Sequence, residues 1–164
     1  MNIQAIHAIY DYNYWATARI LDAAAKLSSE QFIAPASFPY GGVRGTLVHI
    51  LEAEKSWRLR FEGIPWPGDY AETDFPALPA LQAALQAEEK AMRSYLARLT
   101  DDALAKPVTY PIGEPPGTRS RTLWHCLYHV VNHGTQHRSE AAALLTDYGH
   151  SPGDLDFVDF MKPL

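Results

Sequence analysis

The chain has 164 residues, a formal net charge of −5 and a single cysteine, Cys126. This length fits one domain over residues 1–164, the lone cysteine excludes an internal disulfide, and scattered lysines and arginines disfavour nucleic acid and anionic membranes as partners. No apolar stretch approaches the ~20 residues that cross a bilayer and no cationic, apolar signal region is present at the N-terminus, so we expect a cytoplasmic protein.

The first half of the chain predicts two helices. Apolar residues at helical spacing place the first helix at about residues 3–27, before a break at Ser28-Ser29. The second runs from Val43 to Phe61 and is charged on one side only, and we interpret Glu52 and Glu54 as part of a solvated helical face. A proline- and glycine-rich loop separates the two helices, and Gly63–Gly68 predicts a rigid connector after the second.

The third helix is predicted over residues 78–99, which are rich in Ala, Leu, Gln, Glu and Arg. The span that follows contains Pro107, Pro111, Pro115, Pro116 and Gly117. This composition predicts mostly loop, with Val108–Tyr110 as the only candidate for a short strand.

The fourth helix runs to about Tyr148, where Gly149 is the expected stop, and either Thr118 or Ser120 can cap its start. Four long amphipathic segments without repeats or alternating strands predict an all-α fold, a four-helix bundle with its site between facing helices. Long loops separate helices one and two and helices three and four. We favour an up-down-up-down order of the helices.

Four histidines recur at four-residue intervals in the last predicted helix: His125, His129, His133 and His137. Each interval turns about 40° further round the helix, so one ion can take only an adjacent pair. The apolar stripe of this helix contains His137 and has His133 at its edge, whereas the other two drift toward the flank. His133 and His137 are therefore the inward pair. The flank position predicts a solvated or hydrogen-bonded His125, and leaves His129 a role in orienting a ligand or substrate.

An inward pair of histidines one turn apart commonly binds a transition metal, and a third ligand from another helix leaves coordination positions open. The competing interpretation is that hydrogen bonds satisfy these histidines without a metal. Candidates for the third ligand are His49, His7, His150, Glu52 and Glu140. We favour His49 because apolar residues lie near it in helical projection, although a histidine hydrogen-bonded at a helix interface fits the same pattern.

Two other reactive side chains lie close to the inward pair in sequence. Cys126 projects inward but lies two turns before His133, about 10 Å along the axis, and is interpreted as a small buried hydrophobe. Arg138, next to His137, is a candidate for binding an anionic substrate group, while an exposed or ion-paired arginine fits as well.

Three segments carry a resemblance to a known family. They are Tyr12–Thr17 (YNYWAT), Val43–Ile50 (VRGTLVHI) and His129–Arg138 (HVVNHGTQHR). With these motifs the chain resembles the DinB family, DNA-damage-inducible-like proteins whose fold is shared with certain low-molecular-weight-thiol S-transferases and mycothiol-dependent maleylpyruvate isomerase. The likeness covers nearly the whole chain. This sequence has Ser139 and Glu140 where the usual family ending, His-Arg-Gly-Gln, has glycine and glutamine. The difference affects the pocket next to the histidines and leaves the histidines themselves unchanged.

The resemblance implies a four-helix bundle in which His49, His133 and His137 hold a divalent transition metal, typically zinc or nickel. It selects the same pair in the last helix as the helical phase does. It also implies that a homodimer is compatible with the fold.

We therefore expect a metal-dependent enzyme, most concretely a transferase that activates a low-molecular-weight thiol and presents it to an electrophile. His129 and Arg138 are the candidates for orienting this small-molecule substrate. The alternatives are metal-assisted hydrolysis and a non-enzymatic metal-binding stress protein. A carboxylate-bridged di-iron site fits less well, because it needs Glu-x-x-His motifs on two helices.

Overall fold

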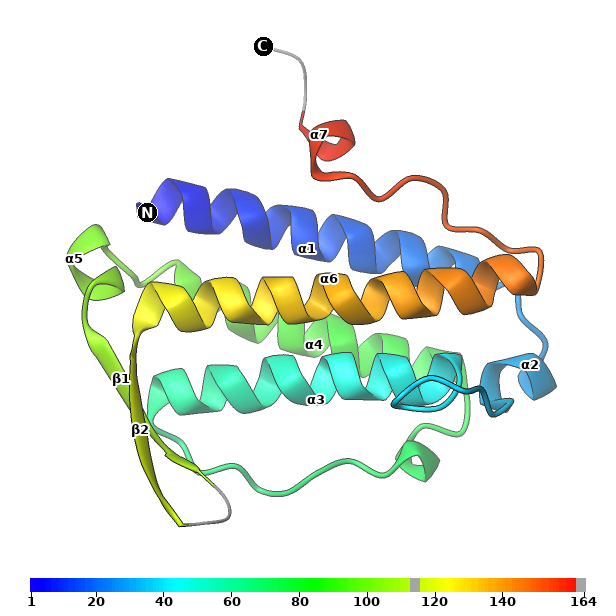
Figure 1. Ribbon diagram of the computed structural model, residues 1–164, viewed down its shortest axis with the longest axis horizontal. Coiled ribbons are helices and arrows are strands. Elements are labelled where there is room, and N and C mark those ends of the chain that lie inside the picture. Colours follow the sequence, from blue (N-terminus) through cyan, green and yellow to red (C-terminus); the bar gives the residue numbers. More distant parts are fainter. Residues whose placement is uncertain (113–115, 162–164) are drawn as a thin grey trace.

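The computed structural model describes residues 1–112 and 116–161 (Figure 1). The chain is mostly helical, and four long helices lie side by side: α1 (Ile3–Ala24), α3 (Val43–Glu62), α4 (Leu78–Leu96) and α6 (Leu123–Asp147). The hydrophobic spacing of the sequence predicts all four. None of the helices within these described residues has the length and apolar character that spanning a membrane requires.

Short helices connect or follow the long ones: α2 (Ser29–Ile33), η1 (Glu72–Asp74), α5 (Asp101–Leu104) and α7 (Phe157–Phe160). The break predicted at Ser28-Ser29 is the start of α2. There the Ser28 hydroxyl accepts a hydrogen bond from the Gln31 amide, and the Gln31 side chain accepts one from the Ser28 amide. This capping box satisfies donors that the first turn leaves free.

A β-hairpin precedes α6 and corrects the all-α prediction. Strands β1 (Pro107–Ile112) and β2 (Gly117–Thr122) pair antiparallel, with Tyr110 opposite Arg119. Prolines are tolerated because each strand of a two-stranded sheet is an edge. Both predicted helix caps, Thr118 and Ser120, lie in β2, and Thr122 is the N-cap of α6. Of the span predicted as loop, Pro115 lies outside the described residues.

The order of the long helices differs from the predicted up-down-up-down arrangement. Residues 63–77 run back along α3, so α3 and α4 point the same way, and α1 and α6 point the opposite way (Figure 1). An ion pair of 3.2 Å between Arg44 and Glu72 fixes the return of this connector at the start of α3. The connector is therefore a crossover along the length of the helices.

The core divides into two apolar clusters along the helix axes. One surrounds Ile20, Leu47 and Leu145, and the other surrounds Ile6, Met92 and Leu127. Five of the buried polar residues fall at mid-length of the long helices, where the two clusters meet: Asn13, Thr17, Glu54, His137 and Arg138. Buried polar groups at this level need partners, and these partners define the surroundings of the site.

Candidate metal site

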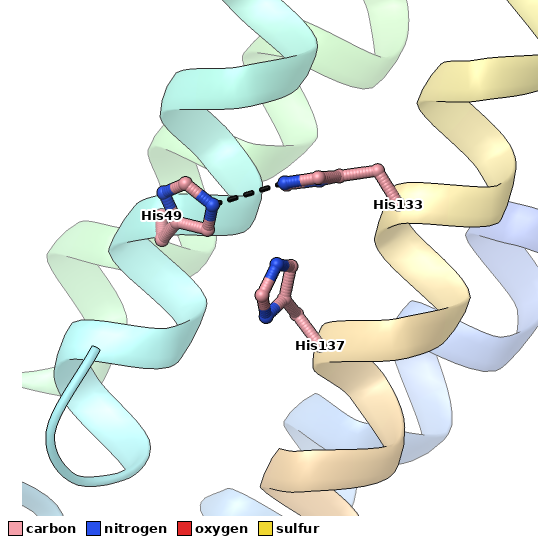
Figure 2. Close-up of side chains that lie close together, drawn as sticks. All are labelled: His49, His133 and His137. Atoms are coloured by element: carbon pink, nitrogen blue, oxygen red, sulfur yellow. Dashed lines mark hydrogen bonds between the residues drawn. The ribbon is translucent and has the colours of Figure 1, made fainter. Parts of the chain in front are cut away.

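Three histidine side chains converge between α3 and α6 (Figure 2). His49 comes from α3, and His133 and His137 come from successive turns of α6. The Nε2 atoms of His49 and His133 are 3.0 Å apart, and a ring nitrogen of each of the three lies within 4.8 Å of the others. The structure thus brings together the three residues that the sequence and the resemblance single out.

The position of the histidines follows from how α3 and α6 pack. His137 is buried and His133 is half-buried, as the helical phase of α6 predicts, because the apolar stripe of that helix faces the core. His49 lies on the flank of α3 that meets α6 and is also half-buried. The rings therefore meet from opposite sides, and two of the three remain partly exposed to solvent.

The surroundings of the site favour neutral imidazoles. Burial, and next the positive charge that His137 carries when protonated, lower the pKa of both His49 and His133 from the usual 6.5 to about 4. Neutral imidazole is the form that offers a nitrogen lone pair to a cation. The pair is thus held in its ligating form at neutral pH.

Glu140 orients the third histidine. Its Oε2 atom lies 2.8 Å from Nδ1 of His137, one turn earlier on α6. With Nδ1 engaged as the donor, the Nε2 atom of His137 remains the free acceptor. Glu140, considered from the sequence as a candidate third ligand, instead contacts the back of His137, and its i,i+3 spacing on one helix was the signal for this contact.

Tyr40 covers His49 on the solvent side. Its ring stacks on the His49 imidazole with centroids 3.4 Å apart and 10° between the planes, and meets His137 edge-on at 5.1 Å. The loop can approach this closely because residue 45 is glycine: a Cβ there would lie 2.1 Å from the Tyr40 carbonyl oxygen. Tyr40 belongs to a loop without periodicity, and nothing in the sequence pattern places it at the site.

An open cavity of about 350 Å³ adjoins His49. Tyr40 and Glu52 line it, together with Tyr70 from the connector that runs back along α3. Glu52 accepts a hydrogen bond of 3.2 Å from the Tyr70 amide and so holds this connector in place. This cavity gives a small molecule access to His49.

His129 continues the row of histidines away from this cavity. Its ring lies 5.9 Å from that of His133 and meets Trp57 of α3 at 5.2 Å between ring centroids. It is exposed and lies outside the cluster. His125, one turn earlier, is exposed as predicted and stacks edge-on against Trp124.

The Arg138 side chain extends from α6 toward α1, away from the histidine cluster. It is 1% exposed, and it donates hydrogen bonds to Asn13 at 2.5 Å and to Thr135 at 2.9 Å. Gly134 makes room for this contact, because a Cβ there would lie 2.8 Å from the Arg138 guanidinium and 2.9 Å from the side-chain amide oxygen of Asn13. Arg138 therefore ties α6 to α1, and we assign it no contact with a substrate.

Glu54 is buried, which corrects its interpretation as part of a solvated face. It is 7% exposed, and its carboxyl accepts a hydrogen bond of 2.5 Å from the Tyr14 hydroxyl. Burial raises its pKa to about 7. Sequence reasoning missed this residue because charged neighbours on α3 surround it, while its partners lie on α1.

The remaining ligand candidates lie outside the cluster. His7 is exposed in the first turns of α1, and His150 lies just beyond the end of α6. Cys126 is 3% exposed, and burial raises the pKa of its thiol, which fits a small buried hydrophobe.

The three histidines fit a divalent transition ion. Two nitrogens bound to one tetrahedral zinc ion lie about 3.3 Å apart, because each Zn–N bond is about 2.0–2.1 Å long. The 3.0 Å between His49 and His133 is close to that spacing. A histidine whose other nitrogen contacts a carboxylate, as in His137, is a common form of metal ligand. The site can therefore bind a metal ion.

Comparisons with known proteins agree with the motifs. A model of the DinB family matches residues 1–163. Among solved structures, the fold is similar to the crystal structure of a DinB-like protein from Bacillus cereus ATCC 10987, with a TM-score of 0.68 and 15% identity over 93% of this chain and 97% of that one. Identity this low shows a shared fold and nothing finer. No curated protein matches the chain. Because the family match spans almost the whole sequence, the chain belongs to the DinB family.

Proposed function

We propose that this protein is a metal-dependent transferase that joins a small thiol to an electrophile. The observation that carries the proposal is the open-sided cluster of His49, His133 and His137, whose ring nitrogens lie within 4.8 Å of one another. Zinc and nickel suit three imidazoles best. When bound, such an ion supplies Lewis acidity, which lowers the pKa of a thiol at neutral pH.

The residues of the chain have separate parts in this function. His49, His133 and His137 hold the ion, and Glu140 fixes the ring of His137. The helices supply this geometry from a bundle-like packing, in which sites lie between facing helices. Tyr40 covers His49 and limits the approach of water from that side.

The reaction exchanges one bond for another. The thiol loses its proton to solvent, a sulfur–carbon bond forms, and the leaving group departs with the electrons of its bond to carbon. The chain's own sulfur does not compete, because Cys126 is buried two turns before His133 on α6. The cavity beside His49 gives the small substrates room to approach.

A panel of small thiols tests the proposal. The metal-loaded protein is mixed with one reactive electrophile, such as 1-chloro-2,4-dinitrobenzene, and each thiol in turn, and the thioether product is measured. Product that requires one thiol, and that is lost in His133→Ala, supports the transferase. The matched control is His125→Ala, which removes an exposed imidazole from the same helix.

The other outcomes separate the alternatives. Turnover of ester or amide substrates without any thiol indicates a metal-dependent hydrolase. Stoichiometric metal with no turnover in either assay indicates a binding protein. Either result contradicts the transferase.

A further inference from the structure

An arginine lies further along α3 from His49, on the side away from Tyr40. Arg60 is on α3, and its guanidinium carbon lies 4.9 Å from the ring centroid of Trp57 and 5.7 Å from that of Tyr110. Trp57 in turn contacts His129, beside His133. Arg60 is thus connected to the histidine cluster by an unbroken row of rings.

Arg60 has no acidic partner among the described residues, unlike Arg44 and Arg58 on the same helix. Within the described part of the chain, no carboxylate lies within 4.0 Å of its guanidinium, and its hydrogen bond goes to the Ser56 hydroxyl at 3.0 Å. By contrast, carboxylates pair with Arg44, Arg58, Arg93 and Arg98. A partly buried cation held between two aromatic rings, in a protein of net charge −5, is available for an anion from outside.

The hairpin adds positive charge at the same place. Arg119 pairs directly with Tyr110 and Arg121 pairs with Val108. Directly paired residues of an antiparallel ladder project from the same face, so both arginines share the face of the hairpin that carries Tyr110. Both are exposed. The positive charge of Arg60 also contributes to the lowered pKa of His129, after burial.

A cavity opens at Arg60. It measures about 260 Å³ and lies between the connector after α3 and strand β1, with Trp66 and Tyr110 among its lining residues. Aromatic walls with one cation are suited to a small organic anion, because the apolar surfaces exclude water around the charge pair.

We propose that Arg60 binds a carboxylate of the thiol substrate and so selects thiols of peptide length. This inference rests on the proposed function, because it assumes that the sulfur lies at the histidine cluster. The three ring-to-ring steps from Arg60 to His133 are each 4.9–5.9 Å. Together these steps make at most about 16 Å, and an extended chain covers about 3.3–3.6 Å per residue, so a thiol of up to about five residues is long enough to reach from one end to the other.

Binding measurements with four probes test this inference. Glutathione is a tripeptide thiol with two carboxylates, and its diethyl ester removes both charges. S-methylglutathione keeps the carboxylates but has no free thiol, and its diester is the fourth probe. Dissociation constants are measured by calorimetry for the metal-loaded wild-type protein, Arg60→Gln, Arg60→Lys and Arg98→Gln. The last variant removes an exposed arginine that is paired with Glu62.

We expect each acid to bind the wild-type protein about tenfold more tightly than its ester, which corresponds to ~1.4 kcal/mol. Arg60→Gln should abolish this preference, Arg60→Lys should retain part of it, and Arg98→Gln should leave it unchanged. Equal affinity for acid and ester in the wild-type protein overturns the inference. So does an equal loss in Arg98→Gln, and so does a failure of all four probes to bind.

The same data separate this inference from the proposed function. If acids are preferred through Arg60 but the free thiol binds no better than its S-methyl form, the carboxylate site stands and thiol activation fails. If the free thiol binds more tightly than the S-methyl form but acid and ester are equal, thiol binding stands and the role of Arg60 is refuted.

Discussion

His137 and Glu140 form a contact of 2.8 Å between Nδ1 and Oε2 on successive turns of α6. His137 is 4% exposed, so its ring has few ways to turn without losing this contact. The carboxylate fixes which nitrogen carries the proton and which one faces His49 and His133. A carboxylate behind a ligating histidine also raises the basicity of the ring, which strengthens its bond to a cation.

Removal of Glu140 should therefore weaken metal binding without removing a ligand. We expect Glu140→Ala to lower the affinity for zinc about 10–100-fold. Glu140→Gln, which keeps one acceptor oxygen, should fall between this variant and the wild-type protein. Competition with a chromogenic chelator measures the affinity. Ser139→Ala is the control, because Ser139 is exposed and bonds only to the Thr135 carbonyl among the described residues. Equal affinities in Glu140→Ala and Ser139→Ala would contradict a role for the carboxylate.

Metal content should depend on the three clustered histidines alone. Elemental analysis of the purified protein should find about one divalent ion per chain, because the three imidazoles form one site. Alanine at His49, His133 or His137 should lower this content strongly. His125→Ala should leave it unchanged, since His125 is exposed three turns before His137. A triple alanine variant that keeps full occupancy would show that the ion binds elsewhere.

Local periodicity was sufficient to predict much of this molecule. The four long helices and the inward pair, His133 and His137, follow from apolar residues at 3.6-residue spacing, because burial of one face is decided within a single helix. His49 needed a second argument, since α3 has apolar groups on several sides. The orienting contact of Glu140 was also readable from its spacing on the same helix.

Features set by contacts between distant segments could not be predicted in this way. Glu54 can be buried because Tyr14 and Asn13 on α1 donate hydrogen bonds to its carboxyl, and nothing near Glu54 in the sequence indicates that contact. α3 and α4 are parallel because residues 63–77 run back along the whole length of α3 (Figure 1). A short turn at the end of α3 would have made the two helices antiparallel, and the composition of residues 63–77 permits both paths. Tyr40 reaches His49 through a loop whose path depends on the glycine at position 45.

Gly45 should be intolerant of a side chain. A Cβ at this position would lie 2.1 Å from the Tyr40 carbonyl oxygen, and backbone has to move to relieve that clash. We expect Gly45→Ala to cost about 1–3 kcal/mol in the free energy of unfolding, as for overpacking elsewhere. Hydrogen exchange should speed up in residues 34–42, because the loop can no longer stay on His49. Urea unfolding measures the stability.

Gly117→Ala is the matched control for this substitution. A Cβ there would meet only side-chain carbons of Ile112, at 3.6 Å, which is ordinary contact. We expect a change within about 0.5 kcal/mol and unchanged exchange in residues 34–42. If the two variants are equally stable, the close approach of the Tyr40 loop to α3 is not a constraint on the fold.

The buried carboxyl of Glu54 should make stability depend on pH. Tyr14 on α1, Glu88 on α4 and Arg138 on α6 are the ionisable groups that act on it, and burial is the main cause of its raised pKa of about 7. Between pH 4.5, which is the ordinary pKa of a glutamate, and about pH 7, Glu54 keeps its proton in the folded chain but has released it in the unfolded chain. This contribution to stability is therefore complete below pH 4.5 and is lost as the pH rises to about 7. The full change in the free energy of unfolding is roughly 3 kcal/mol.

Glu54→Gln isolates this effect from other titrations. His49 and His133 act in the opposite sense, because their pKa values are lowered and their contribution is lost as the pH falls from 6.5 toward about 4. Their contribution is common to both proteins and cancels in the difference. Glutamine keeps an acceptor for the Tyr14 hydroxyl but cannot ionise. The free energy of unfolding of the variant should therefore equal that of the wild-type protein near pH 4.5 and exceed it by up to roughly 3 kcal/mol at pH 8. Denaturant unfolding at both pH values measures the difference, and Asp147→Asn, which neutralises an exposed acid at the end of α6, should show no such gain. A difference between Glu54→Gln and the wild-type protein that stays constant with pH would mean that Glu54 is ionised in the folded protein throughout this range.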